Sequence, residues 1–383
     1  MLFFSKLRIT LISLVTLFFV FTSLSNFQES NDSFISKRIN LGLDLQGGSY
    51  LLLEIDNKPV ELQKLQNTTT VIRNFLKDKK INFSDLRTKD NAIFFIISKK
   101  DNEIVKSFFS DKESVINPYY NQYKSHQYDL IIKENEFKLT LSKYGLIEIK
   151  TSSQDQAIEI VRRRVDEVGT NEPNILKRGN NRILVELPGL DDPMRIKSLL
   201  GKTANLTFRF VTQNNSDTFG AEMLQFEDDI NEALVSKRII LSGENLLDAQ
   251  PQMNNQTNEP VVSFTLDRVG AKRFGKATSA GIGKQLAIVL DGKIVSSPVI
   301  RDAIVGGSGQ ISGNFTFQSA TDLALLLRSG ALPAPLNIIE ERTVGPDLGQ
   351  DSINAGVFAL LFGFLLVIIF MFFKYKIFGL IAN

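Results

Sequence analysis

Very few side chains in this chain are suited to acid–base or nucleophilic chemistry. The sequence contains one histidine, His126, and no cysteine. Catalysis of the Ser-His-Asp type or a histidine metal site would rest on His126 alone, and a disulfide, a thiolate zinc site or a cysteine nucleophile is excluded. His126 lies in the polar segment PYYNQYKSHQYD, where we expect a loop histidine on a solvated surface.

Two segments carry partial phosphate-binding patterns. A P-loop needs a glycine five residues before the glycine of its Gly-Lys-Ser/Thr end. That position is Ile196 in the segment LLGKT and Thr278 in AGIGKQ. The dinucleotide pattern G-x-G-x-x-G also fails, because Leu286 and Ser312 stand where the third glycine is required. We therefore expect no phosphate-binding loop and no cofactor.

The overall charge also excludes function classes. The chain has 44 basic and 42 acidic residues and a net charge of +2, which is not the basic footprint of a nucleic-acid-binding protein. No spacing typical of covalent, acid–base or metal catalysis remains. We expect a binding or mechanical module with no catalytic residue and no metal ligand.

Two apolar runs near the chain ends predict membrane contact. Residues 353–373 carry no charged side chain, and a helix of this length crosses the ~30 Å hydrocarbon core of a bilayer. Residues 9–24 form a shorter run, for which a transmembrane helix competes with a signal peptide cleaved near Ser25. Lysine and arginine lie on the chain-end side of both runs. This bias predicts that both chain ends are in the cytoplasm and that the residues between the two runs are outside the cytoplasm. The chain turns apolar again after Lys376, so we expect further membrane helices beyond Asn383.

Strand and helix patterns alternate between the two runs, which predicts an α+β fold with helices over one face of a sheet. Before residue 212, we expect strands at 49–55, 92–98, 138–142, 182–187 and 205–211, and helices at 59–77, 151–168 and 192–200. Residues 112–136 are polar and tyrosine-rich, which is typical of a loop or of a partly ordered segment.

The helix expected at 151–168 has the clearest end signals. Ser153 and Gln156 have the spacing of a capping box, and Gly169 follows the last apolar position.

The same helix contains Arg162-Arg163-Arg164, which we interpret as a solvated face rather than an anion site. Arg162 would pair with Asp166, and Arg163 with Glu167, at i,i+4 spacing.

Residues 212–260 are polar and predict a boundary or mobile region. After it, we expect strands at 261–266, 285–290, 293–295, 310–313 and 336–342, and helices at 270–280 and 320–328. Asp291-Gly292 is typical of a type I′ hairpin turn, and Gly306–Gly309 is typical of a flexible loop.

Three stretches, read together, carry a specific pattern. They are LGLDLQGGSYLLLEID (Leu41–Asp56), IVRRRVDEVGTNEPNILKRGNNRILVELPGLDDP (Ile160–Pro193) with GKTANLTFRF (Gly201–Phe210), and KQLAIVLDGKIVSSPVI (Lys284–Ile300) with LRSGALPAPLNIIEERTVGPDLGQDSI (Leu327–Ile353). In these stretches the chain resembles the SecD family, membrane subunits that assist the bacterial Sec export channel. The resemblance covers most of the chain outside residues 57–150, where we expect an extra α/β subdomain of unassigned function.

The resemblance implies a large periplasmic domain with a ferredoxin-like base and an inserted head, between two transmembrane helices. The implied division is 1–28 for the cytoplasmic start and first span, 29–150 for the first base strand and extra subdomain, 151–212 for the base, 213–312 for the head, 313–352 for the return to the base and the membrane connector, 353–373 for the second span and 374–383 for the start of a further membrane region.

It also implies a multi-pass protein of the bacterial inner membrane that completes preprotein export after the SecA step, using the proton motive force. The implied partners are SecF, the SecYEG channel, YajC, unfolded preproteins and membrane lipid. The alternative is a proton-driven small-molecule efflux transporter of the resistance-nodulation-division type. A membrane-anchored enzyme or sensor is a third candidate, against which the failed motif counts argue.

The candidate binding or conformational residues lie where the domain meets the two spans. They are Asp44, Gln46, Gly47, Gly48, Glu341, Arg342, Gly345, Pro346 and Gly349. For the paired glycines we favour a turn that only glycine permits. For the second group a rigid connector competes with a hinge that transmits motion between the spans and the domain.

Overall fold

The computed structural model describes residues 6–25, 47–169, 173–189, 193–212, 220–227, 230–254, 257–344 and 346–376. It divides into two compact units. One is Gly48–Thr343, and the other contains the two chain ends, Met1–Gly47 and Val344–Asn383. Helices and sheets are mixed, which confirms the predicted α+β class.

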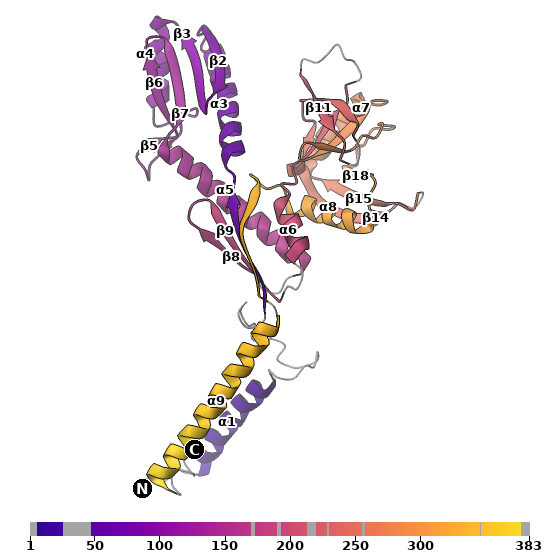
Figure 1. Cartoon of the computed structure of the whole chain (residues 1–383). Helices are drawn as coiled ribbons and strands as arrows, with labels where there is room; N and C mark the ends of the chain where they lie inside the picture. Colours follow the sequence, from indigo (N-terminus) through magenta and orange to yellow (C-terminus); the bar gives the residue numbers. More distant parts are fainter. Residues whose placement is uncertain are drawn as a thin grey trace. The chain divides into compact units, whose positions relative to one another are not determined.

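The chain-end unit contains helices α1 (Lys6–Ser25) and α9 (Pro346–Tyr375) (Figure 1). Among the described residues, one helical segment, Asp351–Tyr375 of α9, is long and apolar enough to cross a membrane. The apolar stretch of α1 is shorter, at Thr10–Phe21.

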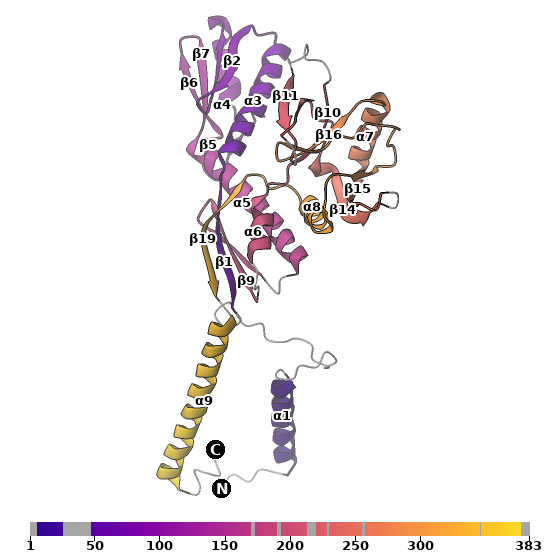
Figure 2. The same ribbon diagram turned by 45° about the vertical axis from the view of Figure 1, so that its right-hand side comes forward.

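The described residues of the larger unit form three large hydrophobic cores and a small fourth cluster of Val235, Ala287, Val289 and Ile294. The first large core, here the base core, is built on one four-stranded sheet. Its strands are β1 (Gly48–Ile55), β8 (Asn174–Arg178), β9 (Arg182–Pro188) and β19 (Leu336–Val344), in the order β19-β1-β9-β8. Helices α5 (Lys143–Val168) and α6 (Pro193–Gly201) pack on this sheet (Figure 2). Leu51 and Leu53 of β1 meet Val161 and Val165 of α5 in the core, all with no exposed surface.

Helix α5 begins earlier than the sequence predicts. Its N-cap is Ser142, whose Oγ accepts a hydrogen bond from the Gly145 N–H at 3.0 Å. Ser153 lies inside the helix and is 3% exposed, so the capping box predicted there is wrong. The error arises because Ile149, a buried residue, continues the apolar stripe toward the N-terminus. Gly169 ends the helix as predicted, with a left-handed φ of 82°.

The second core, here the insert core, lies between β1 and β8 in the chain. Its elements are α3 (Lys58–Asp78), β2 (Phe83–Lys89), β3 (Ala92–Ile97), η1 (Lys99–Asp101), α4 (Asn102–Ser110), β6 (Tyr128–Lys133) and β7 (Glu136–Leu141). The strands form a sheet in the order β2-β3-β7-β6. Helices α3 and α4 lie beside this sheet (Figure 1). They contribute Leu65, Ile72 and Phe109 to a core with Phe95 and Phe137 of the sheet.

The segment 112–136, predicted to be a loop or partly ordered, contains β6 and a small hairpin, β4 (Tyr119–Tyr120) and β5 (Ser125–His126). Its tyrosines pack instead of lying in solvent: the Tyr128 hydroxyl lies 2.7 Å from Thr68 Oγ1 of α3. His126 is a half-buried strand residue, and its Nδ1 lies 3.0 Å from the Asn117 carbonyl oxygen.

The third core, here the head core, combines two sheets and two helices. One sheet has the order β13-β10-β16-β17, and the other β14-β15-β18. The elements are β10 (Leu206–Phe210), β13 (Leu241–Ser242), η2 (Gly243–Asn245), β14 (Leu246–Met253), β15 (Pro260–Leu266), α7 (Arg268–Ala280), β16 (Leu286–Leu290), β17 (Lys293–Ser296), β18 (Ser308–Ile311) and α8 (Phe317–Ser329). The rings of Phe208, Phe264 and Phe274 lie together at its centre.

Two sequence predictions for this region have different outcomes. The type I′ turn is confirmed, since Asp291 and Gly292 have φ of 50° and 82° between β16 and β17. The described parts of the polar stretch 212–260, for which the sequence predicted a boundary or mobile region, contain β13 and β14 and a further hairpin of β11 (Ala221–Gln225) and β12 (Glu232–Ser236). The head core includes residues on both sides of the expected 213–312 range, because β10 pairs with β16 and α8 packs on β14.

Arg164 joins the base core to both segments that lead to and from the head core. Its guanidinium donates hydrogen bonds to the carbonyl oxygens of Leu199 (2.6 Å), Lys202, Thr203 (3.4 Å) and Gly330 (3.2 Å). The side chain is 1% exposed. Burial lowers the pKa of Arg164 to about 10, which leaves it charged at neutral pH.

The sequence predicted that the three arginines of α5 all lie on a solvated face. This prediction is wrong for one of them. Arg162 pairs with Glu159 (2.9 Å) and not with Asp166. Glu167 pairs with Arg328 of α8, and Arg164 is buried.

The two segments that accept hydrogen bonds from Arg164 also form hydrogen bonds with each other and with the head core. The Leu332 N–H donates to the Thr203 carbonyl oxygen at 2.8 Å. The Asp291 carboxylate accepts hydrogen bonds from the Thr203 hydroxyl and from the N–H groups of Ala204 (3.0 Å) and Asn205 (2.7 Å).

Substitution of Arg164 by methionine should lower the free energy of unfolding by about 3 kcal/mol, because buried carbonyl groups lose their donors. Urea unfolding of the full chain in detergent, followed by circular dichroism, measures the change. The matched control is Arg163→Met on the exposed face of α5, which should change stability by about 0.5 kcal/mol or less. Equal losses in the two variants would contradict the role of Arg164.

Candidate functional site

The paired glycines form a turn that other residues do not readily adopt. Gly47 and Gly48 have φ of 72° and 132°, and both are buried. Gly48 is the first residue of β1, where it lies opposite Pro188 of β9. A residue with a side chain at either position would have to adopt a positive φ, which L-residues rarely do.

The remaining candidates near the spans are described in part. Asp44, Gln46 and Gly345 lie outside the described residues. Pro346 is the first residue of α9, a position that suits its fixed φ and missing N–H. Gly349 lies within the continuous helix α9.

Glu341 and Arg342 lie near the end of β19 and point to different partners. Glu341 forms an ion pair with Lys197 of α6. Arg342 pairs with Glu340 at 2.7 Å, and its guanidinium carbon lies 6.0 Å from the centre of the Tyr50 ring. Since Tyr50 is in β1, the structure brings the start of β1 and the end of β19 together, as neighbouring strands.

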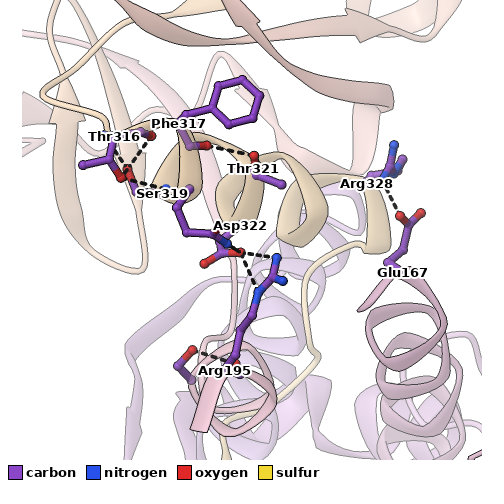
Figure 3. Close-up of polar contacts among 10 residues, drawn as sticks. Glu167, Arg195, Thr316, Phe317, Ser319, Thr321, Asp322 and Arg328 are labelled. Atoms are coloured by element: carbon purple, nitrogen blue, oxygen red, sulfur yellow. Dashed lines mark hydrogen bonds and ion pairs between the residues drawn. The ribbon is translucent and has the colours of Figure 1, made fainter. Parts of the chain in front are cut away.

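Contacts of α8 with α5 and α6 join the head core to the base core outside the connecting segments (Figure 3). Arg195 of α6 donates two hydrogen bonds to Asp322 of α8, at 2.9 and 3.3 Å. Arg328, in the last turn of α8, pairs with Glu167 of α5. These partners lie more than a hundred positions apart in the sequence, so no local spacing predicts them.

The start of α8 is fixed by its own residues. Thr316 is the N-cap and forms a capping box with Ser319, with hydrogen bonds of 3.1 and 2.9 Å (Figure 3). This box sets the N-terminal end of the helix that presents Asp322 and Arg328 to the base core.

A groove on the head core combines an apolar floor with basic walls. It has a volume of about 550 Å³, and Phe210, Ile239 and Ile240 contribute its apolar surface. Arg238, Arg273 and Lys276 line it as well, and no carboxylate is among its described lining residues. Within the described ranges, no three histidine, cysteine or carboxylate side chains group as metal ligands. The arrangement is suited to contact with apolar and acidic groups.

Replacement of Gly48 by alanine should destabilise the chain by about 1–3 kcal/mol, because the strained φ persists in the folded state. Gly201→Ala is the control, since a Cβ at the end of α6 would meet open space. Thermal unfolding measured by circular dichroism compares the two variants. A Gly48→Ala variant as stable as Gly201→Ala would contradict the conformational role of the paired glycines.

Family models match three parts of the chain. "SecD/SecF GG Motif" matches residues 33–58, "Protein translocase subunit SecDF, P1 domain, N-terminal" matches 154–213, and "SecDF, P1 head subdomain" matches 221–334. The first of these contains the paired glycines, and the last contains most of the head core. The insert core lies almost entirely between the first two matches.

Similar whole proteins agree with the family models. The protein translocase subunit SecD of Rickettsia conorii is 39% identical over 99% of this chain and 73% of its own length. That of Magnetococcus marinus is 40% identical over 91% of this chain and 67% of its own length. A crystal structure of SecDF in a super-membrane-facing form matches with a TM-score of 0.50 and 27% identity, over 95% of this chain and 39% of that one. This chain belongs to the SecD family of protein translocase subunits.

Proposed function

We propose that this chain is an auxiliary subunit of the Sec preprotein translocase. With SecF, it uses the proton motive force to complete export through SecYEG after the SecA step, and the residues between its two end helices bind the emerging chain. Similarity to SecD over 99% of the chain is the observation that carries the proposal. The role is mechanical and not enzymatic, in keeping with the incomplete nucleotide-binding motifs and the lack of any catalytic spacing in the sequence.

The proposed location is the bacterial inner membrane, as a multi-pass protein with Gly48–Thr343 in the periplasm. The apolar helix α9 supports a membrane span. The basic flanks at Lys374 and Lys376 support a cytoplasmic chain end after it. SecF, SecYEG and YajC are the proposed protein partners.

We propose a ferredoxin-like arrangement for the base. Its elements follow one another as strand, helix, strand, strand, helix and strand, from β1 through α5, β8, β9 and α6 to β19. This is the element order of the split β-α-β motif. The sheet order β19-β1-β9-β8 places the first and last strands side by side.

The proposed motion is a swing of the head core on the base core. Arg164 would be the pivot, because both connecting segments bond to it. The ion pairs Arg195–Asp322 and Arg328–Glu167 would be releasable contacts, since partly exposed pairs of this kind each contribute about 0–1 kcal/mol. A contact of that strength can open and close during a cycle, whereas the buried guanidinium cannot leave its carbonyls at similar cost.

The groove with Phe210 at its floor is a proposed contact for the emerging chain. Apolar surface beside basic side chains favours unfolded segments, which expose apolar and acidic side chains together. Binding would be weak and tolerant of sequence, because client proteins differ.

Depletion of the protein from cells should slow the last stage of export. Precursors should accumulate with part of the chain already accessible outside the membrane, because the proposed action follows the SecA step. Pulse labelling combined with protease added to spheroplasts measures this intermediate. Precursors that accumulate only inside the cell, or export at an unchanged rate, would argue against the proposed role.

The swing can be tested with cysteines at positions 195 and 322, because the chain has no native cysteine. A short reducible thiol crosslinker between Arg195→Cys and Asp322→Cys should block export, and reduction should restore it. The control pair is Arg195→Cys with Ser198→Cys, which links two positions within α6. Undiminished export with the first pair fully crosslinked would exclude the swing as a required step.

A further inference from the structure

The insert core ends in a strand edge with a specific internal partner. Strand β6 is the last strand of the order β2-β3-β7-β6, so only one of its edges pairs with another strand. At the other edge, the Tyr128 N–H donates to Asn117 Oδ1 at 2.8 Å, and the Tyr128 carbonyl oxygen accepts from Asn117 Nδ2 at 3.2 Å. The main-chain groups of Tyr128 therefore point away from β7.

The next outward-facing residues follow from strand geometry. In an antiparallel pair, residues alternate between those that bond to the neighbouring strand and those that face away. Because Tyr128 faces away, Leu130 and Ile132 do so as well. β6 and β7 pair without a register shift from Tyr128 to Lys133, so this alternation is uninterrupted. No described residue outside β6 and β7 bonds to the main chain of Leu130 or Ile132.

Asn117 shows what the free edge can accept. Its carboxamide makes the two hydrogen bonds that the main chain of an added strand would make to Tyr128. The side chain is 2% exposed, and its Nδ2 also donates to the Phe109 carbonyl oxygen at 2.9 Å, so it is fixed in place. One amide is thus already bound at the end of the edge, and the two following positions are open.

Three other edge strands, β2, β14 and β19, are less suited to accept a chain. β2, at the opposite edge of the same sheet, has a register shift between Ser84 and Arg87. β14 also has a register shift and contains Pro251, which lacks an N–H. β19 carries Glu340, Glu341 and Arg342 in succession. Shifts, prolines and charges are the usual means by which proteins protect an edge, and β6 has neither a shift nor a proline.

We propose that the free edge of β6 binds an extended segment of unfolded polypeptide as an added strand, through main-chain hydrogen bonds to Leu130 and Ile132. The occupant is a client chain in transit, so the inference rests on the proposed function and assigns a role to the insert core. Main-chain groups are the same in every sequence, and strand addition obtains affinity from them. A subunit that serves many different preproteins needs recognition of this kind. Side chains around Ile131, which is 46% exposed, would add contact area on one face.

The test uses the full chain in detergent and a synthetic twelve-residue peptide of alternating threonine and valine with a lysine at each end. Amide-resolved hydrogen exchange follows Leu130 and Ile132. At a peptide concentration about ten times Kd, exchange at these two amides should slow about tenfold, because only free protein exchanges. The same peptide with its central amides N-methylated, so that neither edge can donate a hydrogen bond, should give no protection.

Two variants distinguish peptide binding through the main chain of Ile132 from binding through its side chain. Ile132→Pro removes an outward N–H and leaves the ladder to β7 intact, so peptide affinity should fall about fivefold, the effect of one hydrogen bond. Ile132→Ala keeps the N–H and should bind like the original chain. Equal weakening in both variants would overturn the proposal, because affinity would then depend on the side chain.

The remaining outcomes distinguish this inference from the proposed function. Peptide binding that protects other amides and not Leu130 and Ile132 overturns the strand-addition site but leaves client binding intact. Protection of these amides that rises with protein concentration in the absence of peptide identifies a second copy of the chain as the occupant and overturns the proposal. No peptide binding anywhere on the chain overturns both.

Discussion

The buried guanidinium of Arg164 is the interaction on which the connection between the base core and the head core depends. A charged group with 1% exposure has lost its hydration, and main-chain carbonyl oxygens replace the water. These oxygens belong to both segments that run between the two cores, at Lys202 and Thr203 on one side and Gly330 on the other. Separation of either segment from α5 would leave part of a buried charge without acceptors, which is a strongly unfavourable state.

Outside this point, the two cores meet through apolar contacts and through ion pairs. Leu199 of α6 is buried in the head core, and Val168 of α5 packs against both cores. Arg195–Asp322 and Arg328–Glu167 are partly exposed ion pairs, each of which contributes little in water. The hydrogen bonds of Arg164 to the connecting segments are strong, and the ion pairs of α8 are weak. A pivot between the two cores requires this difference. This difference in strength is the physical basis for the proposed swing.

Helix α5 contacts elements of the insert, the base and the head. It runs from Lys143 to Val168, about 39 Å at 1.5 Å per residue. Its first turns contact β5 and β7 of the insert, and it also contacts β8 and β9 of the base and α8 of the head. A continuous helix transmits displacement between its ends. A chain bound at the edge of β6 and a head core bound near Arg164 would therefore act on the same rigid element.

The sequence by itself determined the elements that depend on local pattern and the family to which the chain belongs. Short apolar runs located β1, β9 and β15, Gly169 ended α5, and Asp291-Gly292 formed its hairpin turn, because each depends on neighbouring residues alone. Only the tertiary structure decided which polar residues are buried. Arg162, Arg163 and Arg164 are equivalent in composition and spacing, yet Arg164 alone points at carbonyl groups that lie 35 to 166 positions away. In the polar, tyrosine-rich segment around β6, the fold likewise supplies Thr68 of α3 as a partner of Tyr128, while Asn117 of the same segment bonds to the main chain of Tyr128.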